Sequence, residues 1–203
     1  MKLYLASGNA HKVAEFQALA AASRFALKIV SAREVGGMPP VEEDTGTFIG
    51  NARKKAHALK TKIPPNTWVL ADDSGLCVDA LGGAPGVESA YYAGPAGDGA
   101  ANLAKLVATM RNVEKADRAA RFVCVLLLHA PDGAEYVYQG RCEGRLAEVP
   151  SGGGGFGYDP LFIPEGHSCT FSDLPEGTKN TLSHRGRAWN KLAEAQSIWL
   201  RVS

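Results

Sequence analysis

Short apolar runs and amphipathic segments alternate along this chain of 203 residues. Continuous apolar runs of about four to eight residues are typical of buried strands, and apolar residues recurring every three or four positions are typical of helices with one buried face. Strands are expected at residues 2–6, 27–30, 68–71, 121–129, 135–139, 141–149 and 161–164. Helices are expected at residues 13–19, 47–59, 102–110 and 188–199. Asp132 and Gly133 predict a hairpin turn between two of the strands.

Two adjacent acids, Asp72 and Asp73, follow the apolar run 68–71 and precede Ser74 and Gly75. We expect the strand to end at these acids, because the apolar run stops there. Ligands in open α/β sheets bind beyond the carboxyl ends of strands, so the acids would lie where a ligand is expected. Adjacent carboxylates repel each other unless a cation shares their site. A Mg²⁺ ion, held by one or two carboxylates and by substrate phosphates, meets that need and indicates metal-dependent phosphate chemistry. The alternative is an Asp-Asp-Ser-Gly turn whose side chains only bind backbone groups.

The turn between the first strand and the first helix is a second candidate anion site. It consists of Ser7, Gly8, Asn9, Ala10, His11 and Lys12. Free backbone N–H groups and the positive end of a helix dipole favour a phosphate at such a turn, and Lys12 adds a full charge. The turn lacks the Gly-x-x-x-x-Gly-Lys-Ser/Thr pattern of a Walker A loop. In the alternative interpretation, Ser7 or Asn9 only caps the helix.

Two further segments allow both a functional and a structural interpretation. Glu43 lies in an acidic turn ahead of the helix expected at 47–59. It either stabilises that helix through its dipole or completes the metal site begun by Asp73. The run Gly152–Gly155 precedes Phe156 and Tyr158, either of which could stack on a flat ring. The alternative there is a flexible hairpin loop beside a core aromatic.

Composition limits the possible classes of protein. The length suits one domain, and 45% hydrophobic residues suffice for a real core. A net charge of +1 argues against a protein whose main role is to bind long nucleic acids. The four cysteines are far apart and predict neither a zinc site nor a disulfide framework. Because no signal peptide or membrane span is predicted, we expect a cytoplasmic protein without a membrane partner.

Five segments, in order along the chain, carry a family resemblance. They are Ser7-Gly8-Asn9-x-x-Lys12; Glu43 with Phe48-Ile49-x-Asn51-Ala52 and Lys55; Ala71-Asp72-Asp73-Ser74-Gly75-Leu76-x-Val78; Gly82-Gly83-Ala84-Pro85-Gly86-Val87-x-Ser89-Ala90; and Gly155-Phe156-Gly157-Tyr158-Asp159-Pro160 with Lys179-Asn180 and Ser183-His184-Arg185-Gly186. Each motif is weak alone, but the ordered set is specific and covers essentially the whole chain. It resembles the inosine/xanthosine triphosphate pyrophosphatases, the Ham1-like nucleotide house-cleaning enzymes.

The resemblance implies both a fold and an activity. The fold is α/β, an elongated mixed β-sheet with flanking helices, formed by one domain over residues 1–203 whose two lobes surround a substrate cleft. The activity is that of a hydrolase of nucleotide metabolism, which converts ITP, dITP and XTP to the monophosphate and pyrophosphate. The resemblance also implies Mg²⁺ as cofactor and a homodimer.

The resemblance assigns roles to individual residues. Glu43 and Asp73 are the expected metal ligands, and Asp73 is also the expected catalytic base, supported by Asp72 and Asn51. The triphosphate and purine are expected to contact Ser7, Gly8, Asn9, Ala10, His11, Lys12, Lys55, Ser74, Phe156, Gly157, Tyr158, Asp159, Lys179, His184 and Arg185. Donors from His184 and Arg185 would suit the O6 acceptor of a 6-oxo purine and oppose the amino group of adenine.

Two positions depart from the family pattern. Gly50 stands where Glu is usual, and Tyr91 stands where Arg is usual. The first affects a local carboxylate contact, and the second removes a cation from a loop near the expected cleft. The same residues leave two other functions open: a pyrophosphatase for modified pyrimidine or methylated nucleotides, and a regulator that binds nucleotides without catalysis.

Overall fold

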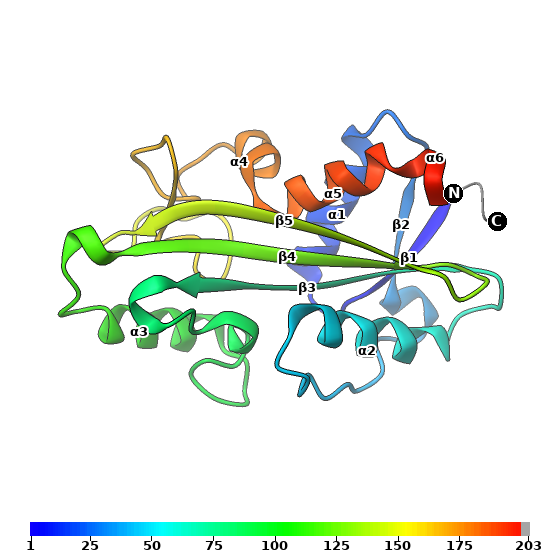
Figure 1. Cartoon of the computed structure of the whole chain (residues 1–203), viewed down its shortest axis with the longest axis horizontal. Helices are drawn as coiled ribbons and strands as arrows, with labels where there is room; N and C mark the ends of the chain where they lie inside the picture. The colour runs from blue at the N-terminus through cyan, green and yellow to red at the C-terminus, as the bar shows by residue number, and fades with distance from the viewer. Residues whose placement is uncertain (200–203) are drawn as a thin grey trace. The chain divides into compact units, whose positions relative to one another are not determined.

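The computed structural model describes residues 1–199 and contains a mixed six-stranded sheet with the order β2-β1-β3-β4-β5-β6 (Figure 1). The strands are β1 (Lys2–Ala6), β2 (Lys28–Ser31), β3 (Trp68–Val78), β4 (Ala119–His129), β5 (Glu135–Leu146) and β6 (Phe162–Pro164). The helices are α1 (Ala10–Ala22), α2 (Phe48–Lys60), α3 (Gly99–Thr109), α4 (Glu176–Leu182), α5 (His184–Glu194) and α6 (Gln196–Trp199). β1 pairs in parallel with β2 and β3, whereas β5 and β6 are antiparallel. The predicted α/β class with a mixed sheet is confirmed.

The chain folds into two compact units. Unit 1 contains residues 1–73, residues 124–140 and the segment from Gly186 on; unit 2 contains residues 74–123 and 141–185. The chain passes from one unit to the other within β3, β4, β5 and α5. None of the helices in residues 1–199 is long and apolar enough to cross a membrane.

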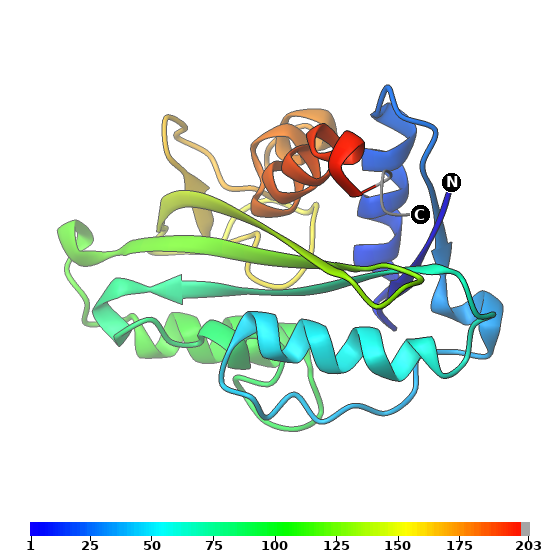
Figure 2. The same cartoon turned by 45° about the vertical axis from the view of Figure 1, so that its right-hand side comes forward.

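In unit 1, helices cover both faces of the sheet: α1 and α5 lie on one face, and α2 lies on the other (Figures 1 and 2). Successive strand residues point to opposite faces, so each strand contributes to two apolar layers. Leu5 and Leu70 pack in one cluster with Phe16 of α1 and with Trp189 of α5. The other cluster joins Ala6, Val69 and Ala71 to Ala52, Ala56 and Leu59 of α2.

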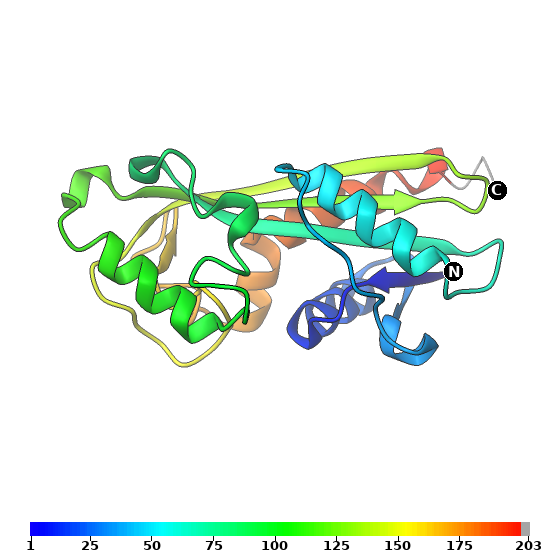
Figure 3. The same cartoon turned by 90° about the horizontal axis from the view of Figure 1, so that it is seen from below.

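Unit 2 has a core of its own. Leu106 and Met110, at the end of α3, pack with Leu76 and Val78 of β3. α3 lies on the lower side of this unit in Figure 1 and on the near side in Figure 3. Three phenylalanine rings complete the core, with ring centroids 4.8 to 5.9 Å apart: Phe122, Phe162 and Phe171.

Two strands are longer than the apolar pattern predicts. β3 does not end at Asp72 but continues to Val78, because Leu76 and Val78 are buried in the core of unit 2. Its pairing with β1 stops at the Ala6–Ala71 pair, so the two acids lie past the end of β1 yet inside β3. β5 is one strand where two were expected, since Gly140 does not interrupt it.

Candidate functional site

The strand alternation in β3 turns Asp72 and Asp73 toward opposite faces of the sheet. Both acids are buried, with exposed fractions of 1% and 4%. Each is paired with a lysine of the helix that covers its face. Lys12 Nζ of α1 lies 2.7 Å from Asp72 Oδ2, and Lys55 Nζ of α2 lies 2.6 Å from Asp73 Oδ1. The two neighbouring carboxylates therefore belong to two different ion pairs.

Asp73 is the centre of a cluster in unit 1. Lys55 Nζ also lies 3.0 Å from Glu43 Oε2, so one ammonium contacts two carboxylates. Asn51 Nδ2 donates to Asp73 Oδ2 at 3.3 Å. The side-chain amide oxygen of Asn51, Oδ1, is also held in place, because it accepts hydrogen bonds from Thr45 Oγ1 at 2.7 Å and from Thr45 N at 3.2 Å. These contacts fix the amide so that its donor group faces Asp73.

Burial and ion pairing act in opposite directions on the protonation of this cluster. It raises the pKa of the Asp73 carboxyl to about 6, against the opposing effect of the Lys55 and Lys12 charges. Burial also opposes the charge on Lys55, but the carboxylates of Asp73, Glu43 and Asp72 outweigh it and raise the pKa of the ammonium. Near neutral pH, Asp73 is thus mainly an ionised carboxylate that can accept a proton.

The same cluster has the donor chemistry of a divalent cation site. Hard ions such as Mg²⁺ bind carboxylate oxygens, and one or two carboxylates are usual. Glu43 and Asp73 satisfy this requirement, because an oxygen of each lies within 3.0 Å of one ammonium nitrogen. The side chain of Asp72 is turned to the α1 face and contacts Cys124 Sγ at 3.3 Å and Lys12 instead. The residues present therefore fit a metal held by Glu43 and Asp73.

The turn at residues 7–12 joins β1 to α1 in unit 1. Asn9 Oδ1 accepts from the backbone N–H groups of His11 at 2.9 Å and of Lys12 at 3.2 Å, so Asn9 caps the helix as the alternative interpretation stated. Ser7 is buried, and its Oγ accepts from Asn9 N at 3.2 Å. Gly8, Ala10 and His11 are exposed at the start of the helix, where the dipole favours an anion.

A second cluster lies in unit 2 around the half-buried ring of Phe156. Lys179 Nζ lies 5.4 Å and Arg185 Cζ 5.8 Å from the centre of that ring. Asp159 Oδ2 accepts from Lys179 Nζ at 2.7 Å and from the backbone N–H of Phe156 at 2.9 Å. Gly155 is required beside it, because a Cβ at that position would lie 2.3 Å from Asp159 Oδ2.

Arg185 and His184 connect this cluster to the strands of unit 2. Arg185 Nη2 donates to Ser74 Oγ at 2.9 Å, and Ser74 directly follows Asp73 in β3. The buried imidazole of His184 stacks on Phe122, with ring centroids 4.7 Å apart and planes 12° from parallel. This stacking fixes the ring plane of His184 before any ligand binds.

Phe156 and Tyr158 differ in their environments. The Tyr158 ring is 5% exposed within the core of unit 2, and its hydroxyl donates to Ser89 O at 2.8 Å. Tyr158 thus has the surroundings of the core aromatic that the alternative interpretation described. Phe156 is half-buried and has two cations beside its ring, so it is the less enclosed of the two candidate stacking residues.

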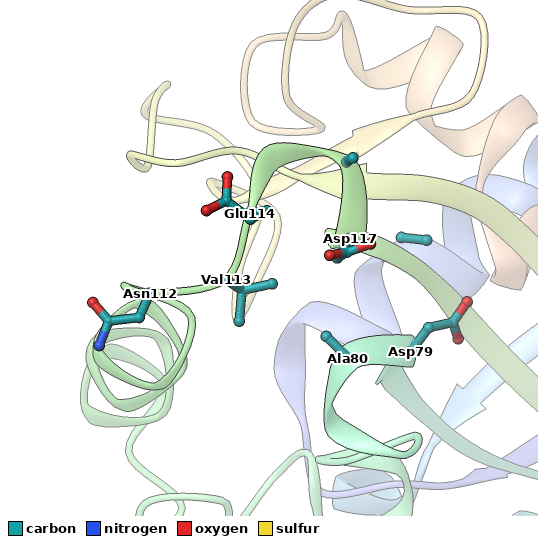
Figure 4. A pocket seen from close by; sticks show the side chains of 8 residues that line it. Asp79, Ala80, Asn112, Val113, Glu114 and Asp117 are labelled. Atoms are coloured by element: carbon teal, nitrogen blue, oxygen red, sulfur yellow. The ribbon is translucent and has the colours of Figure 1, made fainter.

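A cavity of about 580 Å³ in unit 2 lies elsewhere (Figure 4). Its lining residues are Asp79, Ala80, Asn112, Val113, Glu114, Ala116, Asp117 and Ala119. Three of them are acids, so the local field opposes a triphosphate. This cavity is therefore unsuited to the anionic part of a nucleotide.

Comparison with known proteins identifies the family. Residues 3–195 match the sequence model of the Ham1 family. A protein of Opitutus terrae named dITP/XTP pyrophosphatase is 59% identical over 198 residues, which are 96% of this chain and 98% of that protein. The chain belongs to the Ham1 family. A further relative named dITP/XTP pyrophosphatase, from Leuconostoc mesenteroides, is 43% identical and covers 99% of both chains.

Solved structures of Ham1 proteins have the same fold. The Ham1 protein of Staphylococcus aureus superposes with a TM-score of 0.83 at 35% identity, covering 98% of this chain and 100% of that one. The Ham1 protein of Coxiella burnetii gives a TM-score of 0.82 at 36% identity, with 98% and 99% covered. The resemblance found in the sequence is confirmed at the level of the Ham1 family.

Sequence reasoning missed two features of this Ham1-family site. The apolar pattern of α2 does not show that Asn51 and Lys55 lie on its buried face, yet both are buried against Asp73, with exposed fractions of 0% and 8%. Sequence reasoning also missed Thr45, which holds Asn51 and fills the space over Gly50. A Cβ at Gly50 would lie 2.3 Å from Thr45 Oγ1, so this chain has no room there for the Glu usual in the family. The presence of glycine at position 50, where the family usually has Glu, was the sequence signal for the close contact with Thr45.

Proposed function

We propose that this chain hydrolyses non-standard purine nucleoside triphosphates, namely ITP, dITP and XTP, to the monophosphate and pyrophosphate. The observation that carries the proposal is the cluster of Asp73, Lys55 and Glu43, which combines two buried or half-buried carboxylates with a cation in a Ham1-family chain. The names of the relatives, dITP/XTP pyrophosphatase, supply the substrate class.

In this proposal unit 1 binds the triphosphate. Lys12, Lys55 and the turn at residues 7–12 supply positive charge and backbone donors to the phosphate oxygens. Glu43 and Asp73 hold a divalent ion, proposed to be Mg²⁺, which when bound neutralises phosphate charge and activates water. Asp72 keeps Lys12 in place through their 2.7 Å ion pair, and Asn51 orients Asp73.

The reaction is hydrolysis at the α-phosphorus. A water oxygen attacks the α-phosphorus, the bond from that atom to the bridging oxygen of the β-phosphate breaks, and pyrophosphate leaves. Asp73 accepts the proton of the attacking water, because its carboxylate is ionised near neutral pH and fixed by Asn51 and Lys55. The arrangement positions the base before substrate arrives, which lowers the entropic part of the barrier.

Unit 2 is proposed to bind the purine. Phe156 offers a ring face on which the base can stack. Arg185 and His184 supply donors for the O6 acceptor of a 6-oxo purine, whereas the amino group of adenine would face those donors without a bond. Asp159 and Lys179 hold the Phe156 segment, and Ser74 holds Arg185. Gly157 and Tyr158 complete the segment, and Tyr158 anchors it in the core of unit 2 through its hydrogen bond to Ser89 O.

We further propose that both units serve this one activity, so that residues 1–203 are a single pyrophosphatase domain, and that the protein is a cytoplasmic homodimer with no nucleic-acid or membrane partner. Tyr91 is 46% exposed, so its replacement of the usual Arg changes the surface and not the core.

Pyrophosphate release tests the proposal. The full chain is incubated with ITP, XTP, GTP and ATP, with Mg²⁺ and with EDTA. We expect release from ITP and XTP well above that from ATP, and only with Mg²⁺; GTP, which shares the O6 acceptor, tests whether the site also distinguishes position 2 of the base. Binding of ITP without product would favour the non-catalytic regulator, and a preference for modified pyrimidine nucleotides would favour the related pyrophosphatase class.

A further inference from the structure

Two histidines and a glutamate of unit 1 converge outside the cluster around Asp73. They are His57 of α2, His129 at the end of β4 and Glu135 at the start of β5. One potential ligand atom of each lies within 4.8 Å of the other two. Because more than 70 residues separate His57 from the other two along the chain, tertiary folding brings them together.

The spacing of these side chains suits a metal ion of ordinary size. His57 Nε2 lies 3.5 Å from Glu135 Oε1. Two ligands on a tetrahedral zinc ion, with bonds of about 2.0 Å, are roughly 3.3 Å apart. The imidazoles of His57 and His129 lie edge to face, with centroids 5.4 Å apart and planes at 79°. The side chain of His57 is 56% exposed, so it can turn by the short distance that closes the set.

His129 has the surroundings of a supported metal ligand. It is 7% exposed, and its Nδ1 lies 2.8 Å from the carbonyl oxygen of Ala130. Lys60 Nζ lies 2.9 Å from the same Nδ1 and donates to Ala130 O at 2.8 Å. A metal on Nε2 would select the tautomer in which Nδ1–H donates to that carbonyl, and Lys60 would then give up its contact with Nδ1 and keep only its bond to Ala130 O.

Glu135 is also held in place. Arg53 Nε lies 2.9 Å from Glu135 Oε2 and 3.2 Å from Oε1, so the carboxylate orientation is fixed from the α2 side. Only one of the three ligands is a carboxylate, so an ion that needs many charged oxygens is disfavoured. Two imidazoles and one carboxylate instead match ions such as Zn²⁺, Co²⁺ and Ni²⁺.

We propose that His57, His129 and Glu135 bind one zinc-class divalent ion that joins the last turns of α2 to the β4–β5 hairpin, two elements of unit 1 seen in Figure 2. The site is structural. It lies on the helix that supplies Asn51 and Lys55 to Asp73, so the bound ion stabilises the helix that positions the proposed base. It does not depend on the proposed reaction, because none of its residues belongs to the Asp73 cluster.

Zinc binding to the tag-free full chain tests the inference. After treatment with EDTA and its removal, Zn²⁺ is added in the presence of excess Mg²⁺, which occupies sites built only of oxygen ligands. We expect one tightly bound zinc per chain by dialysis and metal analysis. At a hundredfold excess over its dissociation constant, zinc should raise the Tm by roughly 5–10 °C.

Matched variants decide where the zinc binds. His57→Gln changes an exposed residue and should lower zinc affinity at least tenfold and remove most of the Tm rise, while Mg²⁺-dependent turnover without zinc stays unchanged. His167→Gln, a histidine of unit 2 outside the cluster, should keep both. Co²⁺ bound in place of zinc should show the visible absorption of a tetrahedral site, and Glu135→Gln should weaken it. Equal zinc binding by wild type and His57→Gln, or no stoichiometric binding, would overturn the proposal.

Discussion

Lys55 Nζ lies 2.6 Å from Asp73 Oδ1 on the α2 side of the sheet, while the adjacent Asp72 turns to the α1 side and to Lys12. Two neighbouring residues of one strand thus pair with lysines of two different helices and carry different tasks in the proposed mechanism. The following predictions separate those tasks.

Asp73→Asn keeps the size of the side chain and removes its negative charge. Pyrophosphate release from ITP should fall by about 10²–10⁴-fold, because both a metal ligand and the proposed base are lost. The far-UV CD spectrum and the elution volume should remain those of wild type. Asp44→Asn, which changes an exposed acid paired with Lys54, is the control and should keep wild-type turnover. Wild-type-like turnover of Asp73→Asn would refute the assignment.

Lys55→Met leaves Asp73 and Glu43 without their shared cation. Removing one partner of a buried pair typically costs about 3–5 kcal/mol, so the free energy of unfolding, measured by urea titration in EDTA, should drop by that order. Added Mg²⁺ should restore part of the loss, because Glu43 and Asp73 are the residues that would hold it. The neighbouring Lys54→Met breaks only an exposed pair and should leave the urea midpoint nearly unchanged. An equal loss in both variants would argue against a special role for Lys55.

Arg185→Ala removes the guanidinium that bonds Ser74 and lies beside Phe156. The ratio of kcat/KM for ITP over ATP should fall by about 10- to 100-fold, since a charged donor to O6 contributes discrimination of that order. Arg121→Ala, which changes an arginine of the same unit paired with Asp79, should keep the ratio. A general loss of activity with an unchanged ratio would assign Arg185 to structure rather than to base selection.

Gly50→Ala introduces a methyl group 2.3 Å from Thr45 Oγ1. Such overpacking should reduce the free energy of unfolding by about 1–3 kcal/mol and displace the contact that orients Asn51. The double variant Thr45→Gly with Gly50→Ala should recover part of this loss, giving a non-additive cycle. Gly99→Ala, in the first turn of α3 where nothing lies within 4 Å of the added group, should be neutral or stabilising. Strict additivity in the double variant would contradict the contact.

Asp173 stabilises the glycine-rich loop of unit 2 in a pH-dependent way. Hydrogen bonds from Ser151 Oγ at 2.7 Å and Thr170 Oγ1 at 2.9 Å lower the pKa of its carboxyl. An acid whose pKa is lower in the folded state adds stability above its unfolded pKa, and this addition is lost as the pH falls through the folded value. The Tm of wild type should exceed that of Asp173→Asn at pH 5 to 7, and the difference should shrink below about pH 4. A difference that does not change with pH would contradict this role.

The apolar pattern correctly predicts the helices and strands whose buried residues are mainly apolar. β1, the helix from Ala10 and the hairpin after His129 agree with it, because their buried residues are those that periodicity detects. It failed where polar residues are buried. The pattern predicts that β3 stops at Asp72, because an acid is buried inside a strand only when it has a partner. The partners of Asp72 and Asp73 are lysines of α1 and α2, which are distant in sequence and therefore cannot be inferred from the strand itself.

The candidate site shows the same limit. The sequence motifs indicated Asp73, Glu43 and Lys55, but their mutual contacts depend on how α2 packs on β3. The burial of the two aromatic rings could not be predicted from the sequence either. Phe156 and Tyr158 are only two residues apart, yet Phe156 is half-buried and Tyr158 lies in the core. The tight contact between Thr45 and Gly50 could be inferred only after both positions were known in space.

The division of the chain into two interleaved units also affects the order of folding during synthesis. Unit 1 contains β1 and α1, but Trp189 and Trp199 of its main apolar cluster are synthesised more than 160 residues later than these elements. Unit 2 is fully synthesised once Arg185 has emerged. During synthesis, the apolar side chains of β1 and α1 therefore cannot complete their packing until α5 arrives, so segments made early depend on a segment made much later.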